Sequence, residues 1–294
     1  MLETMTSAPP TILSLGFTAV RRLFADEAIP LAGNIAFRTL FSVFPFLIFL
    51  TALAGFFGNE NLAERVVTFL LSVAPEQLVR PLASEIRSIL TVPRTGLLSI
   101  SALLTIWSAM AGVDSVRVGL NRAYDLKENR NLFWLYGQSI LFVIGSAVCL
   151  LIFSVLIVFA PVAFAAIELY APAFKQNVTT LNYFRFPIAI ALLISGLQVC
   201  HHVLPAKRLK TLEVLPGVLF TVIVWVGLSI AFSTYLVNFN TFASTYASLS
   251  GLFAAMFFLY LSALVLIFGG EVNRVLALRR TSSASEILNR DPRE

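Results

Sequence analysis

Six polar side chains lie within or close to long apolar stretches of this sequence, where their chemistry needs an explanation. Arg38 follows the start of one such stretch by seven residues, and Asp114 and Glu271 lie near the ends of two others. An arginine and two carboxylates can pair with one another or bind a charged solute, and asparagine amides can both donate and accept hydrogen bonds. We therefore predict one polar cluster among the helices. Its members are Asn34, Arg38, Asp114, Asn121, Glu271 and Asn273.

The charges in this cluster can be satisfied in more than one way. Arg38 lies about 10 Å along a helix axis from the start of its stretch, so its side chain can extend to the aqueous surface. Otherwise it needs an acidic partner, because an unpaired charge in hydrocarbon is costly. Asp114 and Glu271 fall at a similar depth, and either can be that partner. The cluster either lines a substrate path or holds the helices together.

The sequence offers no pattern for a catalytic centre, a metal site or a bound cofactor. His201 and His202 are adjacent, and adjacent residues point about 100° apart on a helix, so they do not form a metal-binding pair. Cys149 and Cys200 have no partner at ligand spacing. A phosphate-binding GxxxxGK(S/T) loop and a GxSxG nucleophile turn are both absent. We therefore predict no catalytic residue, no metal and no cofactor, in a protein that is not an enzyme.

The composition explains where these polar residues stand. Of the 294 residues, 58% are hydrophobic and 13% are charged, whereas soluble domains have about 45–50% apolar and about 25% charged residues. Apolar runs of about 20 residues are long enough to cross a bilayer as helices. The sequence predicts an all-α, polytopic membrane bundle of about six transmembrane helices plus amphipathic interfacial helices. The expected spans are residues 31–57, 95–118, 133–167, 183–204, 212–237 and 247–278.

The distribution of basic residues predicts the orientation of these spans. Fourteen Lys and Arg residues fall in the N-terminal segment, the second and fourth connections and the C-terminal tail. The connections on the opposite side carry five. Because basic residues are retained on the cytoplasmic side, both termini are expected in the cytoplasm.

The segments outside the spans divide the chain further. Residues 1–30 form an expected cytoplasmic segment in which 11–26 make an amphipathic helix on the membrane surface. Residues 31–278 form the transmembrane domain. Within that domain, residues 58–94 carry apolar side chains at helical spacing and predict two amphipathic helices on the outer face. Residues 279–294 are an expected cytoplasmic tail.

Prolines and glycines predict local departures from regular helix packing. Pro45, Pro161 and Pro187 fall within spans, where a missing N–H and a steric clash bend a helix. Pro216 is expected near the start of its helix, where proline is tolerated. Small residues in the sixth span predict close helix contact. They are Gly251, Gly269 and Gly270.

Four stretches of the sequence resemble the YihY / virulence factor BrkB family of bacterial inner-membrane proteins, once mislabelled ribonuclease BN. They are residues 36–45 (AFRTLFSVFP), 107–113 (WSAMAGV) leading to 120–124 (LNRAY), 215–217 (LPG), and 246–251 (YASLSG) with 270–273 (GEVN). The resemblance covers about residues 15–280 and implies six helices in the inner membrane, without a settled activity. Asn121 and Glu271 fall within the family pattern, whereas many similar proteins have an aromatic residue where Arg38 stands.

Two functional hypotheses follow from these observations. In the first, the protein transports or flips a lipid or an amphipathic solute near the cytoplasmic leaflet, and Arg38 suits an anionic headgroup. In the second, it is a non-transporting membrane scaffold for envelope assembly. Membrane lipids are the expected partners, a homo-oligomer is compatible with the sequence, and nucleic acid is not expected.

Overall fold

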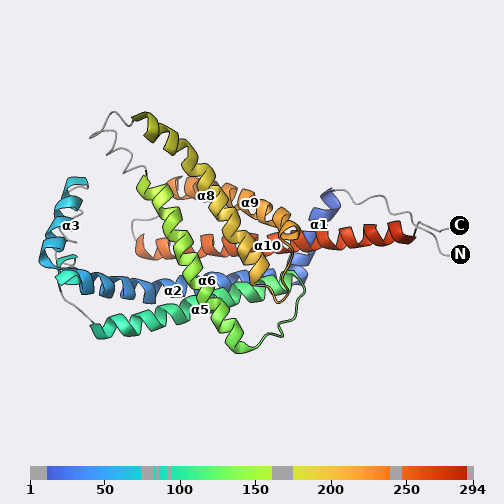
Figure 1. Cartoon of the computed structure of the whole chain (residues 1–294), viewed down its shortest axis with the longest axis horizontal. Helices are drawn as coiled ribbons and strands as arrows, with labels where there is room; N and C mark the ends of the chain where they lie inside the picture. The colour runs from blue at the N-terminus through green and yellow to red at the C-terminus, as the bar shows by residue number, and fades with distance from the viewer. Residues whose placement is uncertain are drawn as a thin grey trace. The chain divides into compact units, whose positions relative to one another are not determined.

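The computed structural model describes residues 12–73, 83, 86–91, 95–160, 175–238 and 247–289. The regular secondary structure in these residues is helical throughout, without a strand, which confirms the predicted all-α class (Figure 1). The helices are α1 (Ile12–Ala25), α2 (Ala28–Phe57), α3 (Glu60–Val73), α5 (Thr95–Ala123), α6 (Leu132–Ser154), the π-helical turn η1 (Val155–Phe159), α8 (Lys175–Val203), α9 (Thr211–Asn238) and α10 (Ala247–Asn289).

Six stretches of helix among the described residues are long and apolar enough to cross a membrane, which confirms the predicted number of spans. They lie in α2, α5, α6 with η1, α8, α9 and α10. In the third of these spans, no residue of the most apolar window is buried within the chain. Exposed apolar surface of this extent is unfavourable in water and suits contact with lipid.

Several helices extend beyond the predicted spans. α5 continues to Ala123 rather than ending at residue 118, so Asn121 lies on the helix itself. α10 has 43 residues and continues well past residue 278 into the predicted tail. The prolines Pro45, Pro187 and Pro216 lie inside continuous helices. Their effect on helix direction stays a prediction, and Pro161 lies outside the described residues.

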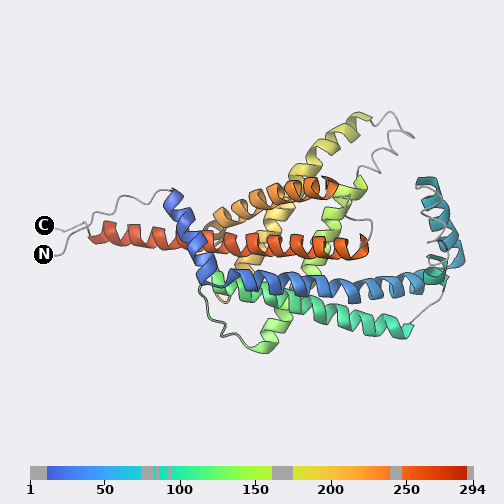
Figure 2. The same cartoon turned by 180° about the vertical axis from the view of Figure 1, so that it is seen from behind.

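The chain divides into two compact units. The first unit holds the described residues up to Ala36 and those from Val113 onward. In it α9 packs along α10, α1 crosses α10, and α8 packs against α9 (Figures 1 and 2). Ala28, Ala32 and Ile35 from the start of α2 pack against Ile267 of α10 in the buried core.

Small residues bring α9 and α10 close together, as predicted for the sixth span. A Cβ atom on Gly217 would overlap the carbonyl oxygen of Gly269, and one on Gly269 would overlap the hydroxyl of Thr221. A Cβ on Gly270 would lie 3.0 Å from the Cβ of Ala123 on α5. Gly251 has no such neighbour within 4 Å among the described residues, so close contact there stays a prediction.

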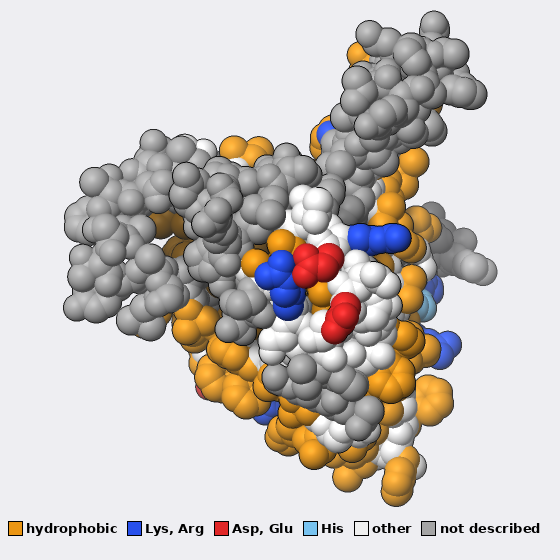
Figure 3. Space-filling view, turned by 90° about the vertical axis from the view of Figure 1, so that its left-hand side faces the viewer, with side chains coloured by type: hydrophobic (Ala, Val, Ile, Leu, Met, Phe, Trp, Pro, Cys, Tyr) orange, Lys and Arg blue, Asp and Glu red, His pale blue; other side chains and the backbone are white. Residues whose placement is uncertain are grey.

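The second unit, residues Phe37–Gly112, contains the rest of α2, α3 and the first part of α5. α3 confirms one of the two predicted amphipathic helices and buries Ala63 and Val67. In the other predicted helix, residues 86–91 are helical and most of the remainder lies outside the described residues. Glu64 of α3 pairs with Arg87 at 2.7 Å on the surface. Figure 3 shows, among the described residues, hydrophobic side chains around a more polar central area that holds several charged side chains.

Candidate functional site

A buried asparagine of α10 joins the start of α9 and the end of α5 in the first unit. Asn273 of α10 accepts a hydrogen bond from the backbone N–H of Gly217 at 2.6 Å. Its amide nitrogen donates to the Val214 carbonyl at 2.9 Å and to the Tyr124 hydroxyl at 3.0 Å. These three partners also fix which way the amide points, because a carbonyl oxygen only accepts. A Cβ on Gly217 would lie 2.6 Å from the side-chain carbon of Asn273, so glycine is needed for this approach.

The Tyr124 hydroxyl extends this network to α8. It lies 2.8 Å from Nδ1 of His201, whose side chain is fully buried at the end of α8. Asn273 donates to the tyrosine oxygen, and this oxygen and Nδ1 of His201 share one further hydrogen bond. Burial raises the pKa of Tyr124, which keeps its hydroxyl protonated.

A second set of contacts fixes the connections beside this network. Asn121 accepts from the backbone N–H of Ala206 at 2.7 Å and donates to Glu128 at 3.1 Å. Arg130 binds both oxygens of Glu128, at 2.7 and 2.6 Å, and donates to the Leu204 carbonyl at 2.9 Å. Hydrogen bonds from Arg130 lower the pKa of Glu128 to about 2. The connections 124–131 and 204–210 are thereby tied to the end of α5.

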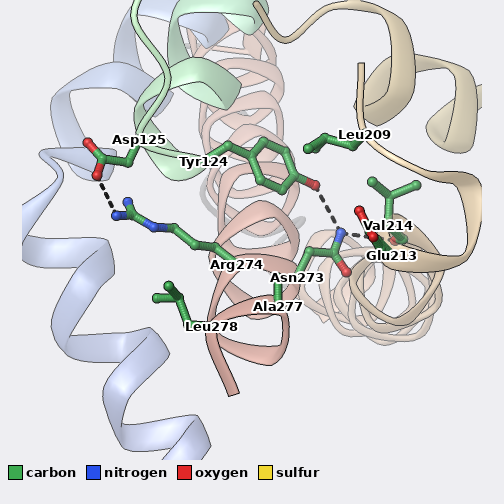
Figure 4. A pocket seen from close by; sticks show the side chains of 9 residues that line it. All are labelled: Tyr124, Asp125, Leu209, Glu213, Val214, Asn273, Arg274, Ala277 and Leu278. Atoms are coloured by element: carbon green, nitrogen blue, oxygen red, sulfur yellow. Dashed lines mark hydrogen bonds and ion pairs between the residues drawn. The ribbon is translucent and has the colours of Figure 1, made fainter. Parts of the chain in front are cut away.

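Arg274, the residue after Asn273 on α10, lines two neighbouring cavities in the first unit. Its guanidinium lies 2.6 Å from Asp125 and 3.9 Å from Asp26 (Figure 4). Asp125 lies two residues after the end of α5, in the left-handed backbone region with φ of 53°, which aspartate tolerates. The first cavity, of about 290 Å³, is lined by Tyr124, Asp125, Leu209, Glu213, Val214, Asn273, Arg274, Ala277 and Leu278. The second, of about 390 Å³, is lined by Thr18, Arg21, Arg22, Ala25, Asp26, Asp125 and Arg274.

Glu271 lies one helical turn before Arg274. Its side chain is fully buried, and neither carboxylate oxygen receives a hydrogen bond from a donor among the described residues. The Asp26 carboxyl lies within hydrogen-bonding reach of it, and the charges of Arg22 and Arg274 act on it. The position of two acids side by side distinguishes this pair from the ion pairs around it.

In the structure, the six residues of the predicted cluster contact different partners. Asn121, Glu271 and Asn273 lie around the end of α5 and on α10, as described above. Asn34 is exposed and donates to Ser115 in a long contact of 3.5 Å. Asp114 pairs with Arg117 at 2.9 Å.

Arg38 belongs to the second unit and donates to the carbonyl of Ala111 at 3.2 Å. The described acids thus have other neighbours: Arg117 for Asp114, and Asp26 for Glu271. The pairing of Arg38 with either acid stays a prediction.

Several residues of this region were not expected from the sequence. Arg117 is 2% exposed and donates to the Ser139 hydroxyl at 2.6 Å, although the sequence indicated only a topology signal there. Arg274 was likewise counted only among the basic residues of the tail. Its spacing, three residues after Glu271 and one after Asn273, was the signal that could have placed it in the site. Arg185, inside the fourth span, stacks over Phe186 at 4.4 Å and was also missed.

Comparison with known proteins places the chain in a family. Residues 19–294 match the family described as virulence factor BrkB. The chain belongs to the virulence factor BrkB family. A relative of this BrkB-family protein is the "Putative ribonuclease-like protein YfkH" of Bacillus subtilis (strain 168), which is 28% identical over 249 residues, or 85% of this chain and 90% of the relative. No solved structure matches the BrkB-family chain.

Among the described residues of this BrkB-family protein, no group of three or more His, Cys, Asp and Glu side chains is placed to hold a metal ion. The contacts that the described side chains of the site make are hydrogen bonds and the ion pairs of Arg130 and Arg274.

Proposed function

We propose that this BrkB-family membrane protein transports or flips an anionic lipid or another amphipathic anion, whose charged group binds at Arg274. The observation that carries the proposal is the position of Arg274 between two cavities, where it pairs with the exposed carboxylate of Asp125. The side chain of Asp125 is 75% exposed, whereas that of Arg274 is 17% exposed. Because the Asp125 carboxylate is largely hydrated, a ligand anion can replace it at the guanidinium without uncovering a buried acid.

The chemistry of arginine supports this choice of ligand. A guanidinium presents a planar set of donors that matches the oxygens of a phosphate or carboxylate. Arg21 and Arg22 line the second cavity and add positive charge beside Arg274. These arginines are expected on the cytoplasmic side of the membrane, which would bring them to the leaflet where anionic lipids are concentrated.

The walls and sizes of the cavities support an amphipathic ligand. Leu209, Val214 and Leu278 line the first cavity together with the polar side chains of Tyr124 and Asn273 (Figure 4). Volumes of about 290 and 390 Å³ fall at the lower end of the range for small-molecule sites. They suit a headgroup, with the acyl chains remaining in the bilayer.

The test is movement of labelled anionic lipid between leaflets of proteoliposomes, with Arg274→Gln compared with the wild type. Loss of a charge-assisted contact of about 1.5–3 kcal/mol predicts a fall in rate of about tenfold or more. Arg208→Gln is the matched control, because Arg208 is exposed and lies outside both cavity linings. Wild-type movement that Arg274→Gln leaves unchanged, or no protein-dependent movement at all, would contradict the proposal.

The alternative function is a non-transporting scaffold for envelope assembly. The observation that favours it is α3, an amphipathic helix between two spans whose exposed Glu64 pairs with Arg87. The arginine hydrogen bond lowers the pKa of Glu64, so the pair stays ionised at neutral pH. Crosslinking from a cysteine placed at Glu64 tests this function. Recovery of a stoichiometric partner protein supports the scaffold, and recovery of none counts against it.

A further inference from the structure

The starting observation is a carboxyl group that is buried without a hydrogen-bond donor. Glu271 is 0% exposed, and both of its oxygens lack a donor among the described residues. An ionised carboxylate in such a place carries a large desolvation cost unless it is paired and hydrogen-bonded. The neighbour within hydrogen-bonding reach is another acid, Asp26, from the end of α1.

Two carboxyl groups can hydrogen-bond to each other only when one of them carries a proton. Ionised carboxylates accept and do not donate, and two negative charges in contact in a dry site repel each other strongly. A single proton between the groups supplies the missing donor and removes one of the two charges. The geometry of Asp26 and Glu271 thus calls for a bound proton.

We propose that Asp26 and Glu271 form a proton-binding site, in which one proton is held between their carboxyl groups and exchanges with water through the second cavity. Asp26 lines that cavity, whereas Glu271 is completely covered. The proton therefore passes through Asp26 to reach Glu271. The inference does not depend on the transport function proposed above.

When Asp26 and Glu271 share one proton, the pair keeps one negative charge. The charged and titratable groups around the pair are compatible with that charge. The positive charges of Arg274, one turn further along α10, and of Arg22 on α1 act on Glu271. Tyr124, from the end of α5, also lies within electrostatic reach and is protonated. Arg274 shares its charge with Asp125 at 2.6 Å and with Asp26 at 3.9 Å.

A proton fits this site better than a metal cation. Hard cations such as Ca²⁺ take about six to eight oxygen ligands, and Mg²⁺ takes an octahedral set. The described charged groups that act on Glu271 are instead one further carboxyl group and two guanidinium groups. The guanidinium groups repel a metal ion, whereas a proton needs only the two carboxyl oxygens between which it lies.

The experiment is infrared difference spectroscopy of the purified protein in lipid nanodiscs at neutral pH. The stretching band of a protonated carboxyl group is compared between the wild type, Glu271→Gln and Asp26→Asn. We expect loss of one protonated carboxyl group in each variant. Glutamine removes the group itself, and the asparagine amide at position 26 donates to Glu271 in place of the proton. Asp125→Asn is the control and is expected to keep the band, because Asp125 pairs with Arg274.

Two further readings complete the test. Glu271→Gln replaces a neutral acid by a neutral amide and is expected to leave the unfolding midpoint close to that of the wild type. If that variant does not fold, Asp26→Asn carries the test alone. A wild-type spectrum that matches both variants would show an ionised Glu271 and overturn the proposal. Loss of the wild-type band on replacing choline by sodium in the buffer would also overturn it, in favour of a metal cation site.

Discussion

The hydrogen bonds of Asn273 lead to a quantitative prediction for Asn273→Leu. The substitution keeps a side chain of similar length but removes the contacts to Gly217, Val214 and Tyr124. A net hydrogen bond contributes about 1 kcal/mol in water-soluble proteins and about 0.6 kcal/mol between membrane helices. Three contacts therefore predict a loss of about 2–3 kcal/mol in the free energy of unfolding, or roughly a 30- to 150-fold change in the folding equilibrium.

The assay is reversible unfolding of the purified protein in mixed micelles, followed by helical circular dichroism. Asn34→Leu is the matched control, because Asn34 is exposed and its hydrogen bond to Ser115 is a long contact of 3.5 Å. We expect that control to change the free energy of unfolding by less than about 0.5 kcal/mol. Equal effects of the two substitutions would refute the reasoning that Asn273 joins the helix ends.

Three further predictions follow from the same region. Gly217→Val should prevent the close approach of α9 to Asn273 and lower the unfolding temperature more than Gly196→Val, since a Cβ on Gly196 meets no atom of the described residues within 4 Å. Equal melting temperatures would contradict this. Glu128 has a pKa of about 2 against an ordinary 4.5, so its stabilisation is complete above pH 4.5 and is lost as the pH falls towards 2. Allowing for partial exposure, Glu128→Gln should cost about 1–2 kcal/mol at neutral pH, and denaturant titrations should show that difference narrowing between pH 4.5 and 2. A cysteine at Lys207 should react with a membrane-impermeant reagent only from the cytoplasmic side, and labelling of intact cells from outside would reverse the predicted orientation.

The membrane spans follow from the sequence because a bilayer imposes a simple length requirement. A helix must keep about 20 apolar residues in hydrocarbon, and the runs that meet this requirement are visible without any tertiary information. The helix ends are less predictable, because protein contacts outside the apolar core determine them. α5, for example, continues past residue 118 to Ala123, and the hydrogen bonds of Asn121 lie in that additional stretch.

The candidate site was predictable only in part. Asn121, Glu271 and Asn273 attracted attention because polar groups in apolar stretches are costly. Their partners could not be identified in the same way, because Asp26 is distant in sequence and Tyr124 is an ordinary interfacial residue by composition. Pairing of charges between distant segments depends on helix packing, which hydropathy does not report. Arg274 shows the same limit, since a basic residue near a helix end has both topological and ligand-binding explanations.

The role of Arg274 is the central claim, and headgroup selectivity tests it most directly. The measurement is the rate of lipid movement in proteoliposomes with an anionic and a zwitterionic labelled lipid, for the wild type, Arg274→Gln and Arg208→Gln. We predict that the wild type and Arg208→Gln move the anionic lipid faster, and that Arg274→Gln loses this preference. Equal rates for the two lipids in the wild type, or a preference that persists in Arg274→Gln, would contradict the account.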